Sequence, residues 1–184
     1  PEHVRVAVNL SPAQFRGRML VGQVKAALAA ARLDPTRLEL EVTESLLLAD
    51  TELTLQTLYG LRELGVRISM DDFGTGYSSL SYLRSFPFDK IKIDRSFMSG
   101  LGPREDSHAI IKAVIGLGQS LGMATTAEGI ETEEQLAVVR AQGCNEVQGF
   151  LFSPPLPASG VAALLGLGTG GEPAAAERRA AGRA

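Results

Sequence analysis

The chain has 184 residues, a length that fits one domain with a sizeable buried core. With 45% apolar and 21% charged residues it has the composition of a globular protein, and a net charge of −3 without a basic patch argues against duplex nucleic acid as a partner. A single cysteine excludes an intrachain disulfide, and no apolar run is long enough for a membrane span, so a cytoplasmic location is expected. Because the chain begins inside a strand pattern and without Met, we expect it to be part of a longer polypeptide, whose upstream segment could still be a membrane anchor.

In the first half of the chain, short alternating or β-branched runs predict strands, and apolar residues at helical spacing predict helices. Strands are expected over residues 4–8 and 38–44 and in the apolar run at 68–70. Helices are expected over residues 20–33 and 53–64, and a further one after Ser11 and Pro12, which suit a helix cap and a first turn.

The alternation continues in the second half, after a Gly- and Ser-rich loop. Strands are expected over residues 88–94, 123–127 and 145–147, and helices over 80–84, 107–121, 132–142 and 160–167. Thr132 to Gln135 has the pattern of a capping box at the start of its helix. From residue 168 on there is no large apolar residue, so we expect a domain over 1–167 and a disordered tail over 168–184.

Strands that alternate with helices of ten or more residues predict an α/β fold with a parallel sheet. A doubly wound sheet is disfavoured because no Gly-rich phosphate turn follows the first strand. A (β/α)₈ barrel of the TIM type usually has eight strands in roughly 250 residues. The six strand–helix units of this chain therefore fit such a barrel without its first quarter.

Every predicted strand ends in a residue that can bind a cation or a water. In a parallel barrel these ends share one mouth, so the side chains should meet there. Oxygen ligands without His or Cys favour Mg²⁺, Mn²⁺ or Ca²⁺ over zinc, and so many carboxylates favour two metal ions. The residues are Asn9, Glu41, Glu44, Asp71, Asp72, Lys92, Asp94, Glu128, Glu131 and Gln148.

The motifs at these strand ends resemble those of the EAL-domain cyclic di-GMP phosphodiesterases. They are Val8 to Pro12, Leu40 to Ser45, Asp71 to Leu80, Ile91 to Asp94, Ala127 to Thr132 and Val147 to Gly149, in one order and over about residues 4 to 157. The resemblance implies a modified (β/α)₈ barrel that hydrolyses cyclic di-GMP to linear pGpG with two Mg²⁺ or Mn²⁺ ions, through in-line attack by an activated water.

The resemblance also implies roles for individual residues. It makes Lys92 and Glu131, assisted by Gln148, the residues that hold and activate the water. Glu44 would anchor the loop that follows Asp72, and a homodimer would form through that loop. The implied metal ligands are Asn9, Glu41, Asp71, Asp72 and Glu128.

The chain departs from the family pattern in one respect. The Glu-Ala-Leu motif, which supplies a further metal ligand, occurs nowhere in this sequence. We expect it upstream in the parent protein, together with sensor or GGDEF-type domains, and we expect this chain alone to be inactive.

Several alternatives stay open. The domain could bind cyclic di-GMP as a receptor without cutting it, or, from the residues alone, be a Mg²⁺-dependent lyase or enolising barrel. Lys92 could form a structural ion pair. Asp94, Phe73 and Tyr77 are expected to contact the substrate, and Phe150 and Phe152 could either stack on guanine or pack in the core.

Overall fold

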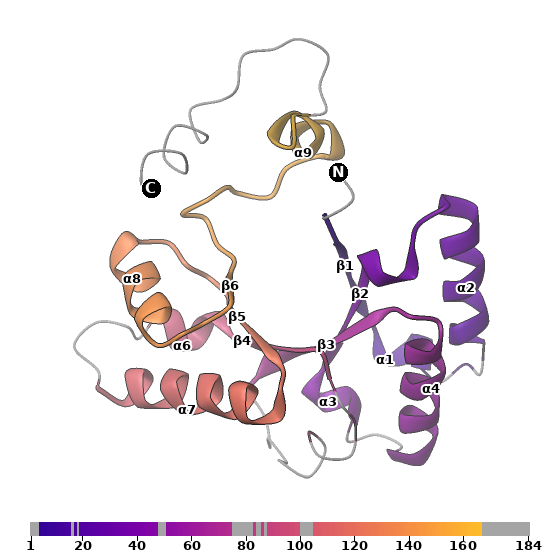
Figure 1. Cartoon of the computed structure of the whole chain (residues 1–184), viewed down its shortest axis with the longest axis horizontal. Coiled ribbons are helices and arrows are strands. Elements are labelled where there is room, and N and C mark those ends of the chain that lie inside the picture. Colours follow the sequence, from indigo (N-terminus) through magenta and orange to yellow (C-terminus); the bar gives the residue numbers. More distant parts are fainter. Residues whose placement is uncertain are drawn as a thin grey trace.

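The computed structural model describes residues 4–15, 17, 19–47, 51–74, 83, 86, 88–99 and 105–166. Within this part of the chain, six strands form one parallel sheet in the order in which they occur in the sequence (Figure 1). Each strand pairs with the next along the chain, as in a barrel wall. The strands are β1 (Val6–Leu10), β2 (Leu38–Thr43), β3 (Arg67–Phe73), β4 (Lys90–Ile93), β5 (Ala124–Ala127) and β6 (Glu146–Val147).

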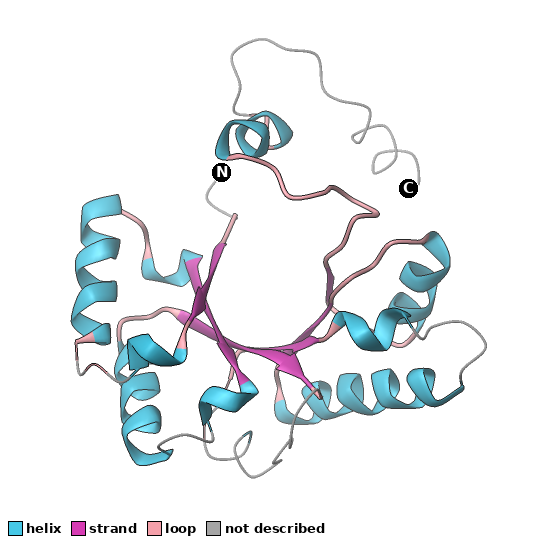
Figure 2. Ribbon diagram, turned by 180° about the vertical axis from the view of Figure 1, so that it is seen from behind, coloured by secondary structure: helices cyan, strands magenta, loops and turns pink. Residues whose placement is uncertain are grey.

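Helices connect the strands and cover the outer, convex side of the curved sheet, while α9 lies across its open side (Figure 2). They are α1 (Pro12–Phe15), α2 (Leu20–Ala31), the 3₁₀ turn η1 (Pro35–Arg37), α3 (Glu44–Leu47), α4 (Thr51–Glu63), α6 (Arg95–Ser99), α7 (Glu105–Leu121), α8 (Glu133–Ala141) and α9 (Ala158–Leu164). Among the helices in the described part of the chain, none has the length and apolar character needed to cross a bilayer.

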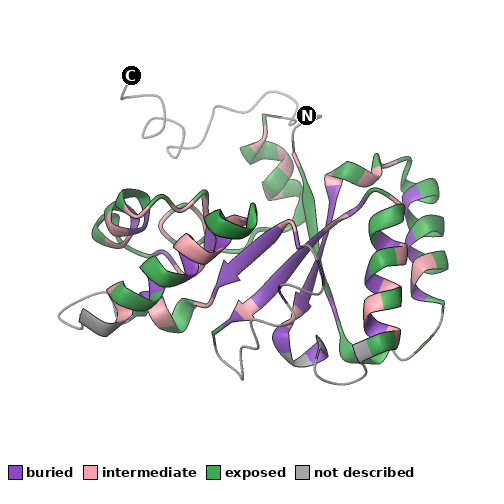
Figure 3. Ribbon diagram, turned by 60° about the horizontal axis from the view of Figure 1, so that its bottom comes forward, coloured by how far each residue is buried: buried purple, intermediate pink, exposed green. Residues whose placement is uncertain are grey.

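The hydrophobic core lies between the sheet and these helices, and the strands β2 to β5 are mostly buried while β1 is largely exposed (Figure 3). Side chains alternate along a strand, so every second residue enters this core. In β2 these are Leu38, Leu40 and Val42, and in β4 they are Ile91 and Ile93. The intervening residues therefore face the concave side of the sheet, which we call the lumen.

The structure confirms the predicted parallel α/β sheet and most element positions to within a few residues. The short helices α3 and α6 and the turn η1 were not predicted, and β1 continues one residue past Asn9. The predicted helix at 80–84 falls almost wholly outside the described residues. The predicted tail at 168–184 lies outside them entirely.

Candidate active site

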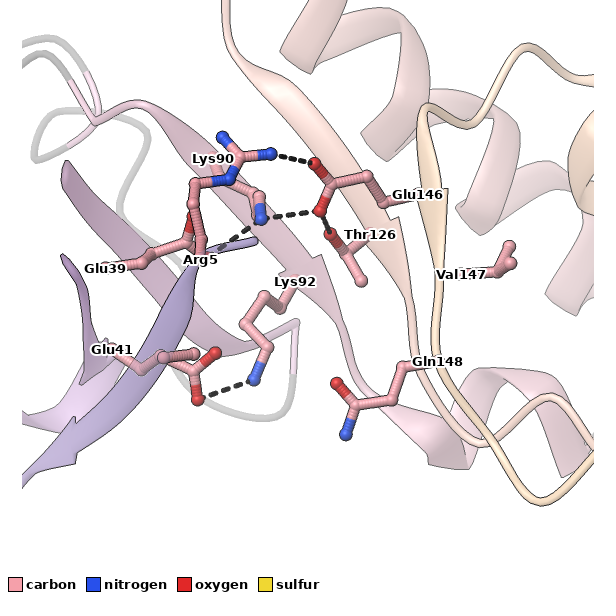
Figure 4. A pocket seen from close by; sticks show the side chains of 10 residues that line it. Arg5, Glu39, Glu41, Lys90, Lys92, Thr126, Glu146, Val147 and Gln148 are labelled. Carbon is pink, nitrogen blue, oxygen red and sulfur yellow. Dashed lines mark hydrogen bonds and ion pairs between the residues drawn. The ribbon is translucent and has the colours of Figure 1, made fainter. Parts of the chain in front are cut away.

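Polar side chains from neighbouring strands meet in the lumen at the carboxyl ends of the strands. Glu41 lies between the core residues Leu40 and Val42, and Lys92 lies between Ile91 and Ile93, so both face the lumen. Figure 4 shows Glu41, Lys92 and Gln148 around one cavity of about 210 Å³. The predicted convergence of strand-end residues is therefore present for these strands.

Lys92 is the centre of the site. Its Nζ lies 2.9 Å from Oε2 of Glu41, 2.9 Å from Oδ1 of Asp71 and 2.7 Å from Oε1 of Glu128. Burial acts to lower the pKa of Lys92, but the hydrogen bonds to Glu128, Asp71 and Glu41 outweigh burial and raise the pKa well above its usual range. Lys92 is 5% exposed and is a cation at neutral pH, compensated by three carboxylates.

Asp71 and Asp72 lie at an irregularity of β3. Adjacent side chains in a regular strand point to opposite faces, which would separate the two carboxylates. Here the register with β4 shifts between Met70 and Phe73, and Asp72 has a left-handed backbone with φ of 53°. A bulge of this kind re-aims side chains, and strained backbone is concentrated at functional sites.

The irregularity brings three carboxylates together. One oxygen each from Asp71, Asp72 and Glu128 can lie within 4.8 Å of the other two. Burial raises the pKa of Asp72, and the negative charges of Asp71 and Asp94 raise it further. Burial also raises the pKa of Glu128, because the favourable contact with Lys92 does not offset it.

Glu41, Asp71 and Glu128 contact the one cation of Lys92, and Asp72 adjoins two of them, so the site holds more acidic groups than Lys92 can neutralise. A divalent cation would supply the missing charge, and the carboxylate oxygens are ligands that Mg²⁺, Mn²⁺ and Ca²⁺ accept. The donor set of Asp71, Asp72 and Glu128 therefore fits the predicted metal.

Backbone hydrogen bonds and a close contact at Gly149 hold Gln148 in position. The N–H of Gln148 donates to the carbonyl of Ala127 at 2.9 Å, and the carbonyl of Gln148 accepts from the N–H of Ile130 at 3.0 Å. A Cβ at Gly149 would collide with the backbone of Ile130, so only glycine permits this close approach. The loop after β6 is thus fixed against the loop that carries Glu128.

Glu131 is placed by the predicted capping box, which the structure confirms. Oγ1 of Thr132 accepts from the N–H of Gln135 at 3.2 Å, and Oε1 of Gln135 accepts from the N–H of Thr132 at 3.1 Å. The same Oε1 accepts from the N–H of Glu131 at 2.8 Å. The cap therefore orders the backbone of Glu131, whose side chain is exposed.

Two cavities adjoin this group, of about 200 and 430 Å³, and Arg95 and Glu131 line both of them. Phe150 lines the smaller cavity and is 66% exposed, so its core alternative is wrong. Phe152 is also largely exposed. Arg95 was not among the predicted site residues, although its position directly after Asp94 was a signal for it.

Asn9, Asp94 and Glu44 have different surroundings. Asn9 lies opposite Glu41 in the register of β1 and β2. Asp94 lines the larger cavity; burial acts to raise its pKa, but hydrogen bonds from Ser96 outweigh it and lower the pKa. Glu44 is buried at the start of α3. The loop that it is expected to anchor lies mostly outside the described residues, so this role stays a prediction.

Phe73 and Tyr77 are the two aromatic residues expected to contact the substrate. Phe73 is 6% exposed and belongs to the hydrophobic core, and its expected contact with the substrate stays a prediction. Its burial follows the irregularity of β3, after which the side chain of Phe73 faces the core. Tyr77 lies outside the described residues.

Comparisons with known sequences match this chain to one family of domains. The sequence profile of the EAL domain matches residues 1–155. The uncharacterized protein y4lL of Sinorhizobium fredii is 55% identical over 165 residues, which are 90% of this chain and 20% of that protein. The cyclic di-GMP phosphodiesterase NbdA of Pseudomonas aeruginosa is 47% identical over 156 residues, 85% of this chain and 20% of that protein.

The bifunctional diguanylate cyclase/cyclic di-GMP phosphodiesterase MucR of Pseudomonas aeruginosa is 47% identical over 153 residues, 83% of this chain and 22% of that protein. This chain thus spans about a fifth of the length of these curated relatives.

Solved structures agree with the sequence comparison. The PaMucR phosphodiesterase in its c-di-GMP complex has a TM-score of 0.82 and 46% identity, over 85% of this chain and 64% of that one. The EAL domain of Mycobacterium smegmatis DcpA has a TM-score of 0.84 and 40% identity, over 91% of this chain and 75% of that one.

Klebsiella pneumoniae BlrP1 in a manganese/cy-diGMP complex has a TM-score of 0.77 and 36% identity, over 82% of this chain and 39% of that one. These similarities confirm the predicted barrel-type fold.

Proposed function

This chain belongs to the EAL domain family, and we propose that it is the part of a cyclic di-GMP phosphodiesterase that binds the metal ions and cuts the dinucleotide to linear pGpG. The observation that carries the proposal is the group of Asp71, Asp72 and Glu128 beside the buried cation of Lys92. The names of the relatives NbdA and MucR, and the c-di-GMP complex of MucR, support the choice of substrate.

We further propose that two Mg²⁺ or Mn²⁺ ions are held by Asp71, Asp72 and Glu128 together with Glu41 and Asn9. The raised pKa values of Asp72 and Glu128 and the complexes of BlrP1 with manganese and with calcium support this assignment. When bound, the ions would neutralise charge on the phosphate and lower the pKa of the attacking water.

Residues of the chain itself are proposed to orient the attacking water and to accept its proton. Hydrolysis forms a bond between the water oxygen and phosphorus, breaks the P–O3′ bond and leaves a proton on the 3′ oxygen. As a cation, Lys92 is proposed to orient the water and to stabilise negative charge. Glu131 is the proposed base, and Gln148 orients the same water.

The substrate is proposed to extend over the adjoining cavities. Phe150 offers an exposed ring on which a guanine can stack, and Arg95 offers a cation for a phosphate oxygen. Asp94 lines the larger cavity, where a carboxylate can accept hydrogen bonds from the N–H groups of guanine.

The parent protein is proposed to supply what this sequence lacks. The Glu-Ala-Leu motif is absent here, and a quarter of the DcpA EAL chain has no counterpart in this one. We propose that the remaining strand–helix units and sensor or cyclase domains belong to the same polypeptide, as the bifunctional name of MucR suggests. The domain limits 1–167 and a homodimer through the loop after Asp72 remain proposals.

The test is hydrolysis of cyclic di-GMP in the presence of Mn²⁺, with pGpG resolved by chromatography. We compare the 184-residue chain with the polypeptide extended upstream by about two strand–helix units, the number that completes eight. Product from the longer polypeptide alone supports the proposal. Binding of cyclic di-GMP by the longer polypeptide without any product would make the domain a receptor instead.

A further inference from the structure

A second layer of charged side chains fills the lumen beneath the proposed site. It consists of Arg5, Glu39, Lys90 and Glu146, which we call the floor network. In Figure 4 these four residues lie together on one side of the cavity, and Glu41, Lys92 and Gln148 lie on the other. The proposed function gives the floor network no role.

The floor network is a continuous chain of short contacts. Nζ of Lys90 lies 2.8 Å from Oε1 of Glu39 and 2.6 Å from Oε2 of Glu146. Nη2 of Arg5 lies 3.0 Å from the other oxygen of Glu146. Burial acts to raise the pKa of Glu146, but Lys90 and Arg5 outweigh it and lower the pKa, which favours the ionised carboxylate.

The network joins strands that do not pair with one another. Lys90 on β4 bridges β2 and β6, and Arg5 at the start of β1 reaches β6, although β1 and β6 are the two edges of the sheet. Backbone hydrogen bonds join only neighbouring strands, so these side chains add contacts between strands that the sheet itself does not pair.

Each buried or half-buried member lies two residues before a residue of the proposed site along the chain. Glu39 precedes Glu41, Lys90 precedes Lys92, and Glu146 precedes Gln148. Two residues along a strand span about 6.6 Å, and their side chains share one face. The distance between two floor residues therefore controls the distance between the two site residues above them.

Stability alone does not account for this layer. The inward layers of such barrels are usually branched apolar residues, and a buried ion pair is often no more stable than apolar residues of the same volume. Here Glu39 and Lys90 are 3% and 6% exposed, and Oε2 of Glu39 has no hydrogen-bond partner within the part of the chain that the structure describes. What the pair provides instead is one defined geometry.

We propose that Glu39, Lys90 and Glu146 are positioning residues, which hold β2, β4 and β6 at the separation that brings Glu41, Lys92 and Gln148 together. This inference rests on the proposed function for its kinetic readout only. Because the network lies beneath the residues of the proposed site, we expect it to act on turnover and not on substrate affinity.

The test replaces the buried pair by neutral residues of similar size, Glu39→Gln with Lys90→Met, in the full-length protein with Mn²⁺. We expect kcat to fall about tenfold to hundredfold, the effect of displacing a reacting group by roughly 1 Å. KM should stay within about threefold of wild type, because ground-state binding does not involve the floor. The single variant Lys90→Arg keeps the cation, so its kcat should lie much closer to that of wild type than the kcat of the double variant does.

Arg62→Gln is the matched control, because it removes a charge from an ion pair with Asp89 that lies outside the lumen. It should leave kcat unchanged. A double variant whose kcat stays within about threefold of wild type, or an equal loss in Arg62→Gln, overturns the proposal. If the double variant does not fold, Glu146→Gln carries the same test, since Glu146 is more exposed.

A second readout separates this inference from the proposed function. The N–H groups of Glu128 and Gln148 donate to Ile93 and Ala127, so their hydrogen exchange reports the order of the strand ends without any substrate. The double variant should exchange faster at these two amides while exchange in α2 is unchanged. Unchanged exchange at both amides contradicts positioning, even if the wild-type protein proves not to hydrolyse cyclic di-GMP.

Discussion

Nζ of Lys92 and Oε2 of Glu41 lie 2.9 Å apart although β3 separates their strands in the sheet. The contact therefore crosses the lumen and does not follow the backbone ladder. It depends on the curvature of the sheet, which turns the inward faces of β2 and β4 toward each other (Figure 2). The proposed chemistry rests on this geometry, because it gathers residues that are distant in sequence.

Replacing Lys92 tests whether this residue acts in catalysis or only forms a structural ion pair. Lys92→Met should leave Mn²⁺ binding largely intact and remove hydrolysis, because the metal is held by oxygen ligands. Without metal, removing one partner of a buried ion pair costs about 3–5 kcal/mol, so the chelated variant should melt well below wild type. Mn²⁺ titration and thermal melting with and without chelator measure both effects.

The Mn²⁺ titration decides between the catalytic and the structural role of Lys92. A variant that no longer binds Mn²⁺ would move Lys92 to the structural ion pair. Recovery of stability on adding Mn²⁺ would show that a cation replaces the lost ammonium.

Replacing Glu131 tests the proposed base. Glu131→Gln keeps the side-chain shape and the capped backbone but cannot accept a proton, so kcat should fall by roughly 10²–10⁴. Binding of Mn²⁺ and the melting temperature should not change, since Glu131 is exposed and outside the carboxylate group. A kcat within about tenfold of wild type would exclude Glu131 as the base.

The floor network predicts a pH dependence. The pKa of Glu146 is lowered in the folded protein by Lys90 and Arg5 against the opposing effect of burial, so its stabilising contribution is present above the unfolded pKa and lost as the pH falls through the folded one. Glu146→Gln should therefore lower the melting temperature at about pH 7, and the difference from wild type should shrink as the pH falls below the ordinary pKa of a glutamate.

The effect should be less than about 1 kcal/mol, because Glu146 is more than a third exposed and solvent screens its ion pairs. A difference between wild type and variant that grows on acidification would have the wrong sign and would contradict the assigned contacts.

The close approach at Gly149 predicts a sharp steric effect. Gly149→Ala should destabilise the fold by about 1–3 kcal/mol, because its Cβ meets the backbone of Ile130, and should displace Gln148. Gly116→Ala in α7 is the control: no atom lies near its added Cβ, so it should be neutral or stabilising by roughly 0.5–1 kcal/mol. Thermal melting of the two variants gives the comparison, and equal melting temperatures would refute the contact.

The sequence predicted the strands that carry Glu41 and Lys92, because strict alternation of apolar and polar residues fixes which side chains face away from the core. It also predicted the capping box that places Glu131, since the interaction is local. Both depend on short-range rules that a single sequence contains.

Two features of the site could not be predicted from the sequence, for physical reasons. The bulge at Asp71 and Asp72 depends on the register between β3 and β4, which is a tertiary property, and the burial of Phe73 follows from it. The floor network joins Glu39, Lys90 and Glu146 on strands that do not pair. Its signal in the sequence is the charged residue that stands two positions before each of Glu41, Lys92 and Gln148.

The most direct test of the account is the rate at which the full-length protein forms pGpG from cyclic di-GMP with Mn²⁺, compared with its Asp71→Ala variant. The account predicts turnover by wild type and a loss beyond the roughly tenfold to hundredfold that follows removal of an outer partner of a metal ligand. Activity of Asp71→Ala within about tenfold of wild type would contradict the metal assignment. Wild-type protein that binds cyclic di-GMP and forms no pGpG would contradict the enzyme itself.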